Sequence, residues 1–501
     1  MPSGPLEITR RAALATLGAG ALGYALLGPR ARSERPDGRL VLDYWEKWTQ
    51  NEAAAMRRVV DRFNQSQNRL WVRYFSMGTI DQKSMIAIAG GSPPDILGLG
   101  NFSIPAYAES GAILPLDDLA ARHSIRREAY APKVWEMLTH VTPTSAQRAR
   151  SVSDGSSNQE EVGAVSDPLA DARGSLHQLA PARGSLYGII NTCGALAMFY
   201  NRALFREAGL DPDNPPRTIQ QLDAAHRALT RFEKNGTLTQ TDDGTSEIAR
   251  AGFLHMEPTW WTWFWGAYFG DSIHDAARNL ATPDSPANLR AYQWVQTYPA
   301  ALKPDRLTKF QTGFGFYGTS EHPFLKGKVA MTNQGPWLAN VIHQYAPELD
   351  YAVAPFPVDE SIYDPAAPIG LLDGDVLVIP RGVRDPEASF EFIAFTQRPE
   401  NIELLSAAHG KNSPLVSQSE DFEKSHVNRF VSVHSKVANS PRAFTFPRTR
   451  TWQEYQAEFD AAMQRMWRLE APAPEALAKV RIAAQKQLDR AAAARARRAA
   501  L

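Results

Sequence analysis

The sequence contains one cysteine, Cys193, among 501 residues. This scarcity excludes an internal disulfide and every multi-cysteine zinc or iron–sulfur site. An excess of charge is also lacking, because Lys plus Arg and Asp plus Glu both number 54. We therefore expect no nucleic-acid partner, and a protein that needs no oxidation to fold.

Common catalytic motifs are missing as well. The sequence has no phosphate-binding glycine loop, no dinucleotide fingerprint after its first strand and no Gly-x-Ser-x-Gly turn. It also lacks His-x-x-x-His spacing, so we predict no metal and no cofactor. Cys193 has no nucleophile signature around it and reads as a small buried side chain. Asp373 and Asp375 form a carboxylate pair, but adjacency alone does not give the separation that glycoside hydrolysis requires.

What is present fits a water-soluble chain of two or three lobes. Hydrophobic residues make up 44% and charged residues 22% of the sequence, which leaves no room for a multi-span membrane protein. Residues 1–39 form the exception. Thr9-Arg10-Arg11 precedes an apolar stretch that reaches Gly28, which resembles a twin-arginine export signal. We expect a periplasmic or extracytoplasmic protein, with cleavage near Ala19-Gly20-Ala21 and retention as an anchor both open.

The chain after the signal opens with a strand–helix–strand pattern. Residues 40–45 and 70–75 are strand-like, and residues 52–63 between them have helical spacing of apolar side chains. This order predicts a parallel sheet with a right-handed crossover, in an α/β fold. Ligand sites in such sheets lie beyond the carboxyl ends of the strands, where residues 45–48 and 100–102 fall.

Residues 141–186 differ from the rest of the chain. Ser, Gly, Ala, Arg and Gln dominate there, and Ala-Arg-Gly-Ser-Leu occurs twice. Such a segment buries too little apolar surface to offset the entropy of ordering it, so we predict a disordered insertion.

Tryptophan is abundant, with twelve in the chain and four between Trp260 and Trp265. Several must pack in a core, but on a helix Trp260 and Trp263 would share one face while Trp261 and Trp265 would share another. One core cannot easily bury both faces. Sugars stack on aromatic faces and need polar partners for their hydroxyls, so spare tryptophans without a catalytic motif favour binding over reaction.

Four segments carry a family resemblance. Gly90-Gly91-Ser92-Pro93-Pro94-Asp95-Ile96, the run from Tyr200-Asn201-Arg202 to Leu210 with Pro215-Pro216-Arg217-Thr218, and Phe324-Leu325-Lys326-Gly327-Lys328 with Gly335-Pro336-Trp337 are three of them. The fourth is the helix-like stretch 386–396 after the strand-like residues 374–379. Together they resemble the extracellular solute-binding proteins of ABC importers, in the family that contains maltose- and glycerol-3-phosphate-binding proteins.

The resemblance implies a periplasmic-binding-protein fold, with two α/β lobes that close by hinge bending around a ligand in the cleft. Lobe one would comprise residues 40–140 and 369–410, and lobe two residues 187–357. Residues 411–489 would be helices that brace both lobes, and residues 490–501 a basic tail that frays. By the same resemblance the cleft residues would be Trp337, which would stack on ligand, Trp45, Glu46, Trp48, Asn101, Asn191, Thr192, Asp373 and His409, and the tryptophan run adds Trp261 and Trp263.

The leading hypothesis is a monomeric substrate-binding component that delivers a sugar, oligosaccharide or sugar derivative to ABC permease subunits. An anionic ligand would need a cation in the cleft, and Lys47 and Arg442 are the candidates. Two alternatives stay open: an exported carbohydrate-active enzyme that uses a cleft carboxylate pair, and an adaptor that has lost ligand binding.

Deleting residues 145–182 tests the predicted insertion. We expect the melting temperature in differential scanning calorimetry to stay nearly unchanged, because a disordered segment contributes little buried surface. A large loss of stability would show that the segment is ordered and packed.

Overall fold

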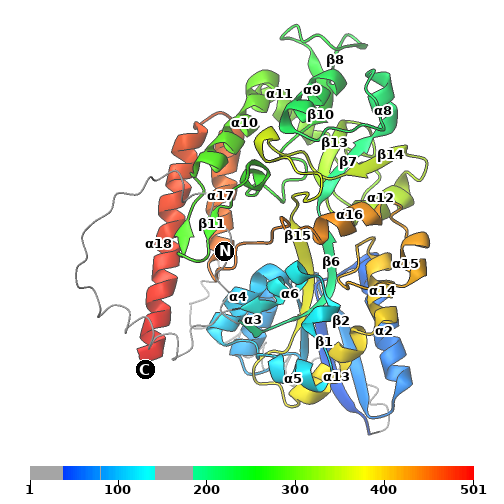
Figure 1. Ribbon diagram of the computed structural model, residues 1–501, viewed down its shortest axis with the longest axis vertical. Coiled ribbons are helices and arrows are strands. Elements are labelled where there is room, and N and C mark those ends of the chain that lie inside the picture. Colours follow the sequence, from blue (N-terminus) through cyan, green and yellow to red (C-terminus); the bar gives the residue numbers. More distant parts are fainter. Residues whose placement is uncertain (1–37, 79, 141–183, 501) are drawn as a thin grey trace, which may run out of the picture.

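A computed structural model describes residues 38–78, 80–140 and 184–500 (Figure 1). Each of two lobes has its own sheet, and the two sheets lie end to end along the long axis of the molecule (Figure 1). This architecture confirms the predicted two-lobed α/β fold. Within the described ranges, no helix is long and apolar enough to cross a membrane.

Lobe one is built on a five-stranded sheet in the order β2-β1-β3-β15-β6. The first two strands pair in parallel around an intervening helix, which confirms the predicted strand–helix–strand opening. β3 is also parallel to β1, whereas β15 runs antiparallel to both of its neighbours. The strands are β1 (Leu40–Glu46), β2 (Leu70–Ser76), β3 (Ile96–Gly100), β6 (Ile189–Ala195) and β15 (Leu372–Val378).

Helices cover this sheet because their apolar faces pack into one core. In α2, for example, Met56, Val59, Val60 and Phe63 recur at helical spacing and are buried. The helices of lobe one are α2 (Gln50–Ser66), α3 (Asp81–Ala89), the 3₁₀ turn η1 (Asn101–Ser103), α4 (Ile104–Ser110), α5 (Asp117–Arg122), η2 (Arg127–Ala129), α6 (Pro132–Leu138), α13 (Pro386–Thr396) and α14 (Pro399–Ala408). A short ladder of β4 (Thr139–His140) and β5 (Ser185–Leu186) completes the lobe.

Lobe two is built on a six-stranded sheet in the order β14-β7-β13-β10-β8-β9. Its strands are β7 (Ala197–Asn201), β8 (Arg231–Lys234), β9 (Thr237–Thr239), β10 (Glu247–Phe253), β13 (Val329–Gln334) and β14 (Tyr351–Ala354). Around it lie α8 (Arg202–Glu207), α9 (Ile219–Leu229), η4 (Trp265–Phe269), the β11 (His274–Asp275) and β12 (Leu280–Ala281) pair, α10 (Pro286–Leu302), α11 (Pro304–Thr312), α12 (Leu338–Tyr345) and η5 (Glu360–Ile362). Asn201 and Thr218 cap α8 and α9 through their side chains, as their residue types favour.

In the described part of the chain, three crossings connect the lobes and lie against one another. The first passes through Leu196, between β6 and β7, and its amide donates to the carbonyl of Leu371 in the second. The third crossing contains Phe444, whose amide donates to Gly370 and whose carbonyl accepts from Leu372. Because the three segments share hydrogen bonds, they form one joint between the lobes.

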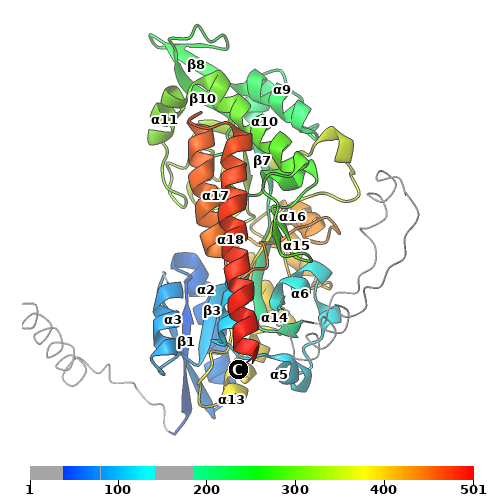
Figure 2. The same cartoon turned by 90° about the vertical axis from the view of Figure 1, so that its left-hand side faces the viewer.

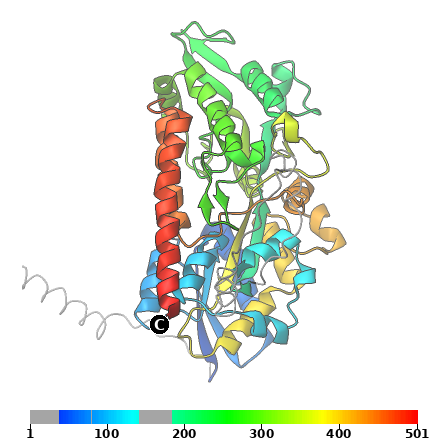
Figure 3. The same cartoon turned by 60° about the vertical axis from the view of Figure 1, so that its left-hand side comes forward.

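The C-terminal part adds α15 (Glu420–Lys424), α16 (Val431–Ala438), α17 (Trp452–Trp467) and α18 (Ala473–Ala500). The last two form an antiparallel pair beside lobe two, and α18 continues down beside lobe one (Figures 2 and 3). Residues 490–500 of the predicted basic tail belong to α18, because the Ala- and Arg-rich end continues the helix, and the fraying of this end stays a prediction.

Other boundaries differ from those expected. β6 pairs inside the sheet of lobe one, so the first crossing follows it instead of preceding it. Residues 258–269 form turns and a 3₁₀ segment instead of a regular helix. The export signal and residues 141–183 of the predicted insertion lie outside the described residues, while its end at Ser185–Leu186 is strand.

Candidate functional site

The first half of β15 and the end of β1 meet at a buried ionic cluster beside the joint. The carboxylate of Asp375 forms an ion pair with Lys47, which directly follows β1. Its Oδ2 accepts from Lys411 Nζ at 2.6 Å and from Thr192 Oγ1 at 2.9 Å. Burial alone would raise the pKa of Asp375, but the charges of Lys411 and Lys47 outweigh burial and hold it well below its usual range.

Other carboxylates surround this cluster. Burial and the charge of Asp375 raise the pKa of Asp373, which lies two residues earlier on the same strand and is partly exposed. Burial also raises the pKa of Glu52. The charge of Lys411 lowers this pKa, and the charge of Asp375 raises it. Burial raises the pKa of Glu46 to about 7 despite a 2.6 Å hydrogen bond from the hydroxyl of Tyr44. Carboxylates therefore outnumber ammonium groups here, and both ammonium groups are paired.

Lobe two faces this cluster with aromatic side chains. The Trp337 indole lies 5.5 Å from Lys411 Nζ, and its Nε1 donates to Gln334 Oε1 at 3.1 Å. Gly194 and Gly335 make room for it, because a Cβ on either glycine would collide with the indole or with Pro336 beside it.

Tyr317 adds a second aromatic group from lobe two. Its ring lies 5.0 Å from that of Trp260, which is 39% exposed. Burial raises the pKa of Tyr317, and the charge of Glu52 in lobe one raises it further. Tyr317, in lobe two, and Glu52, in lobe one, therefore lie near enough for the charge of Glu52 to affect the tyrosine.

A cavity of about 400 Å³ extends this interlobe space on one side. Lobe one contributes α3, Phe102 and Tyr107, and lobe two contributes residues 449–453 at the start of α17. Asp81 on its wall senses the charge of Lys47, so the cavity and the ionic cluster adjoin. We call this cavity, the ionic cluster and the facing aromatic residues the interlobe cleft. Its volume suits a small ligand of one or two rings.

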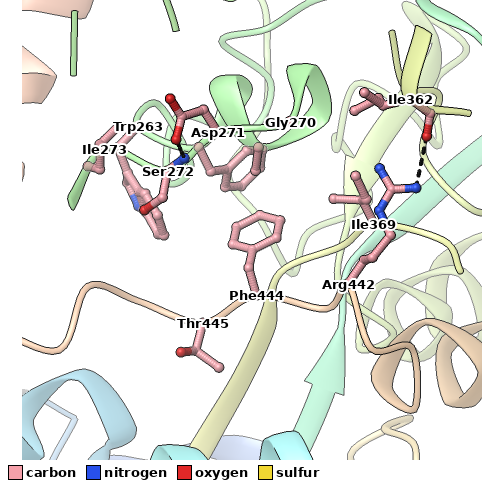
Figure 4. A pocket seen from close by; sticks show the side chains of 12 residues that line it. Trp263, Gly270, Asp271, Ser272, Ile273, Ile362, Ile369, Arg442, Phe444 and Thr445 are labelled. Carbon is pink, nitrogen blue, oxygen red and sulfur yellow. Dashed lines mark hydrogen bonds between the residues drawn. The ribbon is translucent and has the colours of Figure 1, made fainter. Parts of the chain in front are cut away.

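A larger cavity of about 520 Å³ lies elsewhere, between η4 and the joint (Figure 4). Trp263, Ile369 and Phe444 line it together with Arg442. Arg442 Nη1 donates to the carbonyl of Ile362 at 2.8 Å, so the guanidinium holds the chain segment before the second crossing. Among the described residues, none that lines this cavity belongs to the sheet or helices of lobe one.

The structure brings most of the expected cleft residues together. Thr192 belongs to the ionic cluster, while Asn191 donates to Tyr44 Oη at 3.4 Å and Asn101 accepts from the Gly374 amide at 3.3 Å. Trp48 and His409 are buried edge to face, with ring centroids 4.4 Å apart. Trp45 is partly exposed and packs on the core of lobe one.

Trp261 and Trp263 lie in the aromatic core of lobe two, at 9% and 3% exposure. Their contact with ligand stays a prediction, and the neighbouring Trp260, which packs against Tyr317, presents more surface. Four residues of this region were not among the cleft residues predicted from the sequence: Lys411, Glu52, Trp260 and Tyr317. Lys411 lies two positions after His409, which was predicted to be a cleft residue. Trp260 is the first residue of the tryptophan run. The predicted positions were therefore close to these two residues in the sequence.

No group of three or more His, Cys, Asp or Glu side chains in the described ranges is arranged to hold a metal ion. Cys193 is fully buried, and burial raises the pKa of its thiol to about 12.

The comparisons with known proteins agree with this architecture. A model of the bacterial extracellular solute-binding protein family matches residues 58–424. A binding protein of Brucella abortus (strain 2308) is 29% identical over 176 residues, which is 34% of this chain and 37% of that relative. The matched region thus spans little more than a third of the relative's length.

Solved structures share the fold over nearly the whole chain. CpMnBP1 with mannobiose bound superposes with a TM-score of 0.70 at 22% identity, covering 89% of this chain and 100% of that one. The substrate-binding protein Lmo0181 from Listeria monocytogenes, in complex with cycloalternan, gives 0.67 at 14% identity, with 90% and 99% covered. UgpB from Mycobacterium tuberculosis, in complex with glycerophosphocholine, gives 0.64 at 18% identity, with 90% and 99% covered.

Replacing Asp375 tests the ionic cluster. Asp375→Asn leaves two ammonium groups without their shared counter-charge, so we expect the free energy of unfolding at pH 7 to fall by about 3–5 kcal/mol in urea titration. Asp43→Asn is the matched control. It removes a partly exposed ion pair with Arg73 on the same sheet and should cost less than about 1 kcal/mol. Equal losses in the two variants would contradict the description of the cluster.

Proposed function

The chain belongs to the bacterial extracellular solute-binding protein family, and from this we propose that it is the substrate-binding component of an ABC importer. It captures a sugar, oligosaccharide or sugar derivative in the interlobe cleft and delivers it to permease subunits in the cytoplasmic membrane. We further propose that it reaches the periplasm through its twin-arginine-type signal and acts as a monomer.

One observation carries the choice of a carbohydrate: aromatic faces from lobe two lie opposite a surplus of carboxylates from lobe one. Trp337 and Tyr317 supply faces on which the C–H side of a sugar ring stacks. Asp373 and Glu52 supply oxygens that accept hydrogen bonds from hydroxyl groups. Similar structures were solved with mannobiose and cycloalternan bound, which supports the same ligand class here.

The charges argue against an anionic ligand such as a phosphodiester. Lys47 is paired with Asp375, and an anion placed beside it would also approach Asp373 and Glu52. The other cation considered, Arg442, lines the cavity without a lobe-one wall and is bonded to a backbone carbonyl. An uncharged sugar therefore fits the cleft better than a sugar phosphate.

The alternative of a carbohydrate-active enzyme receives less support. Asp373 and Asp375 lie two positions apart on one strand, so both approach the cleft from the same lobe. Glycoside hydrolysis needs two carboxyl groups that flank the scissile bond, and Asp375 is already held by two lysines.

A thermal-shift panel tests the proposal. Because a ligand that binds only the folded chain raises its melting temperature, we expect saturable shifts with neutral di- or oligosaccharides and none with sugar phosphates or glycerol 3-phosphate at equal concentration. A shift only with the anionic compounds would contradict the proposed ligand class. Turnover of an aryl glycoside that Asp373→Asn abolishes would establish the enzyme instead, and a flat response to every compound would favour the adaptor.

Replacing Trp337 tests the position of the ligand. We expect Trp337→Ala to weaken binding of the shifting sugar by about 1–3 kcal/mol in isothermal titration calorimetry, since it removes a stacking face. Trp71→Ala is the control, because Trp71 lies near the start of β2, at the end of the strand away from the cleft. Unchanged affinity in Trp337→Ala would show that the ligand binds elsewhere.

A further inference from the structure

The long C-terminal helix is attached firmly to lobe two. Leu477, Val480, Ala484 and Leu488 of α18 are buried in the core of that lobe. Two polar contacts add to this packing. Arg481 Nε lies 2.8 Å from Asp284 Oδ2, and Gln485 Oε1 accepts from the amide of Ala281 at 2.9 Å. The first four turns of α18 therefore move with lobe two.

The other end of α18 contacts lobe one. Arg495 Nη2 lies 3.1 Å from Oε1 of Glu109, near the end of α4. Glu109 is almost fully buried, with 5% of its side chain exposed, and the same oxygen lies 3.1 Å from His140 Nε2. All three views show the helix running beside both lobes, with its C-terminus next to lobe one (Figures 1, 2 and 3).

The helix between these attachments is a stiff connection. Arg481 and Arg495 are 14 residues apart, which in an α-helix is about 21 Å along the axis. A hydrogen-bonded helix does not stretch appreciably, so rotation of the lobes about the joint changes the distance between Arg495 and Glu109. This attachment lies outside the joint, because the three crossings pass through residues 196, 370–372 and 444.

The geometry points to Arg495 and Glu109 as positioning residues for the interlobe cleft: α18 is a strut whose ion pair with lobe one restricts the range of lobe orientations. Breaking this ion pair costs more free energy than breaking an exposed surface pair. The reason is that Glu109 is buried, so its carboxylate depends on Arg495 and His140 instead of water. The inference concerns the movement of the lobes and does not depend on which ligand binds.

Distance measurements between the lobes test the strut. Spin labels on cysteines at Glu128 in lobe one and Glu348 in lobe two, both exposed, report the lobe separation without ligand by double electron–electron resonance. Cys193 is fully buried and stays unlabelled. We expect Arg495→Ala to widen the distance distribution about twofold, because it removes the attachment of α18 to lobe one and lets the lobes adopt more orientations.

Two controls separate the ion pair from a general effect on the helix. Arg497→Ala removes the same charge from an exposed position two residues further along and should leave the distribution unchanged. Arg495→Glu should widen it, and the exchange Arg495→Glu with Glu109→Arg should restore the parent width. If Arg495→Ala leaves the width of the distribution unchanged, the strut is overturned. The same holds if the double variant gives a distribution as wide as that of Arg495→Glu alone. If Arg495→Ala does not fold, a chain ending at Asp489 gives the same two outcomes.

Discussion

The interlobe cleft depends on one buried carboxylate held between two lysines. Asp375 lies on β15, the strand that enters lobe one from the second crossing, and its oxygens join Lys47 at the end of β1 to Lys411. Burying the charges of Asp375 and Lys411 is costly unless each is paired and hydrogen-bonded. The arrangement is therefore formed only when these segments take up their native positions, so the ionic cluster fixes the wall of the cleft as the lobe folds.

That wall also fixes what the cleft offers to a solute. Lys411 lies beneath the Trp337 ring, so the same lysine that neutralises Asp375 supports the aromatic face of lobe two. Both ammonium groups are occupied, whereas Asp373 and Glu52 are partly exposed toward the space between the lobes. Hydroxyl groups satisfy such carboxylates without bringing a charge of their own, which is the chemical reason for proposing an uncharged carbohydrate.

The sequence predicted the lobes well and the cleft only in part. The strand–helix–strand opening, the helix at Pro386–Thr396 and the fold class followed from periodicity and from the family resemblance, and the structure agrees with them. The strand β6 was expected in lobe two, which was predicted to begin at residue 187, yet its pairing with β15 places it in the sheet of lobe one.

Side-chain partnerships were harder to foresee, because they join residues far apart in the chain. Lys47 and Asp375 are separated by 328 positions, and no sequence motif links the two residues. Tyr317 likewise belongs to no motif, and its position is set by a turn that precedes β13. The tryptophan run shows the converse: its composition suggested a binding surface, whereas Trp263 and Trp265 pack almost fully into the core of lobe two.

Hydrogen–deuterium exchange with and without the sugar that gives the largest thermal shift tests most directly that the solute binds in the interlobe cleft. The account predicts that bound sugar slows exchange in peptides covering residues 46–52, 335–337 and 373–375, which come from both lobes. Slowed exchange confined to residues 270–273 and 442–445, around the cavity without a wall from lobe one, would contradict it.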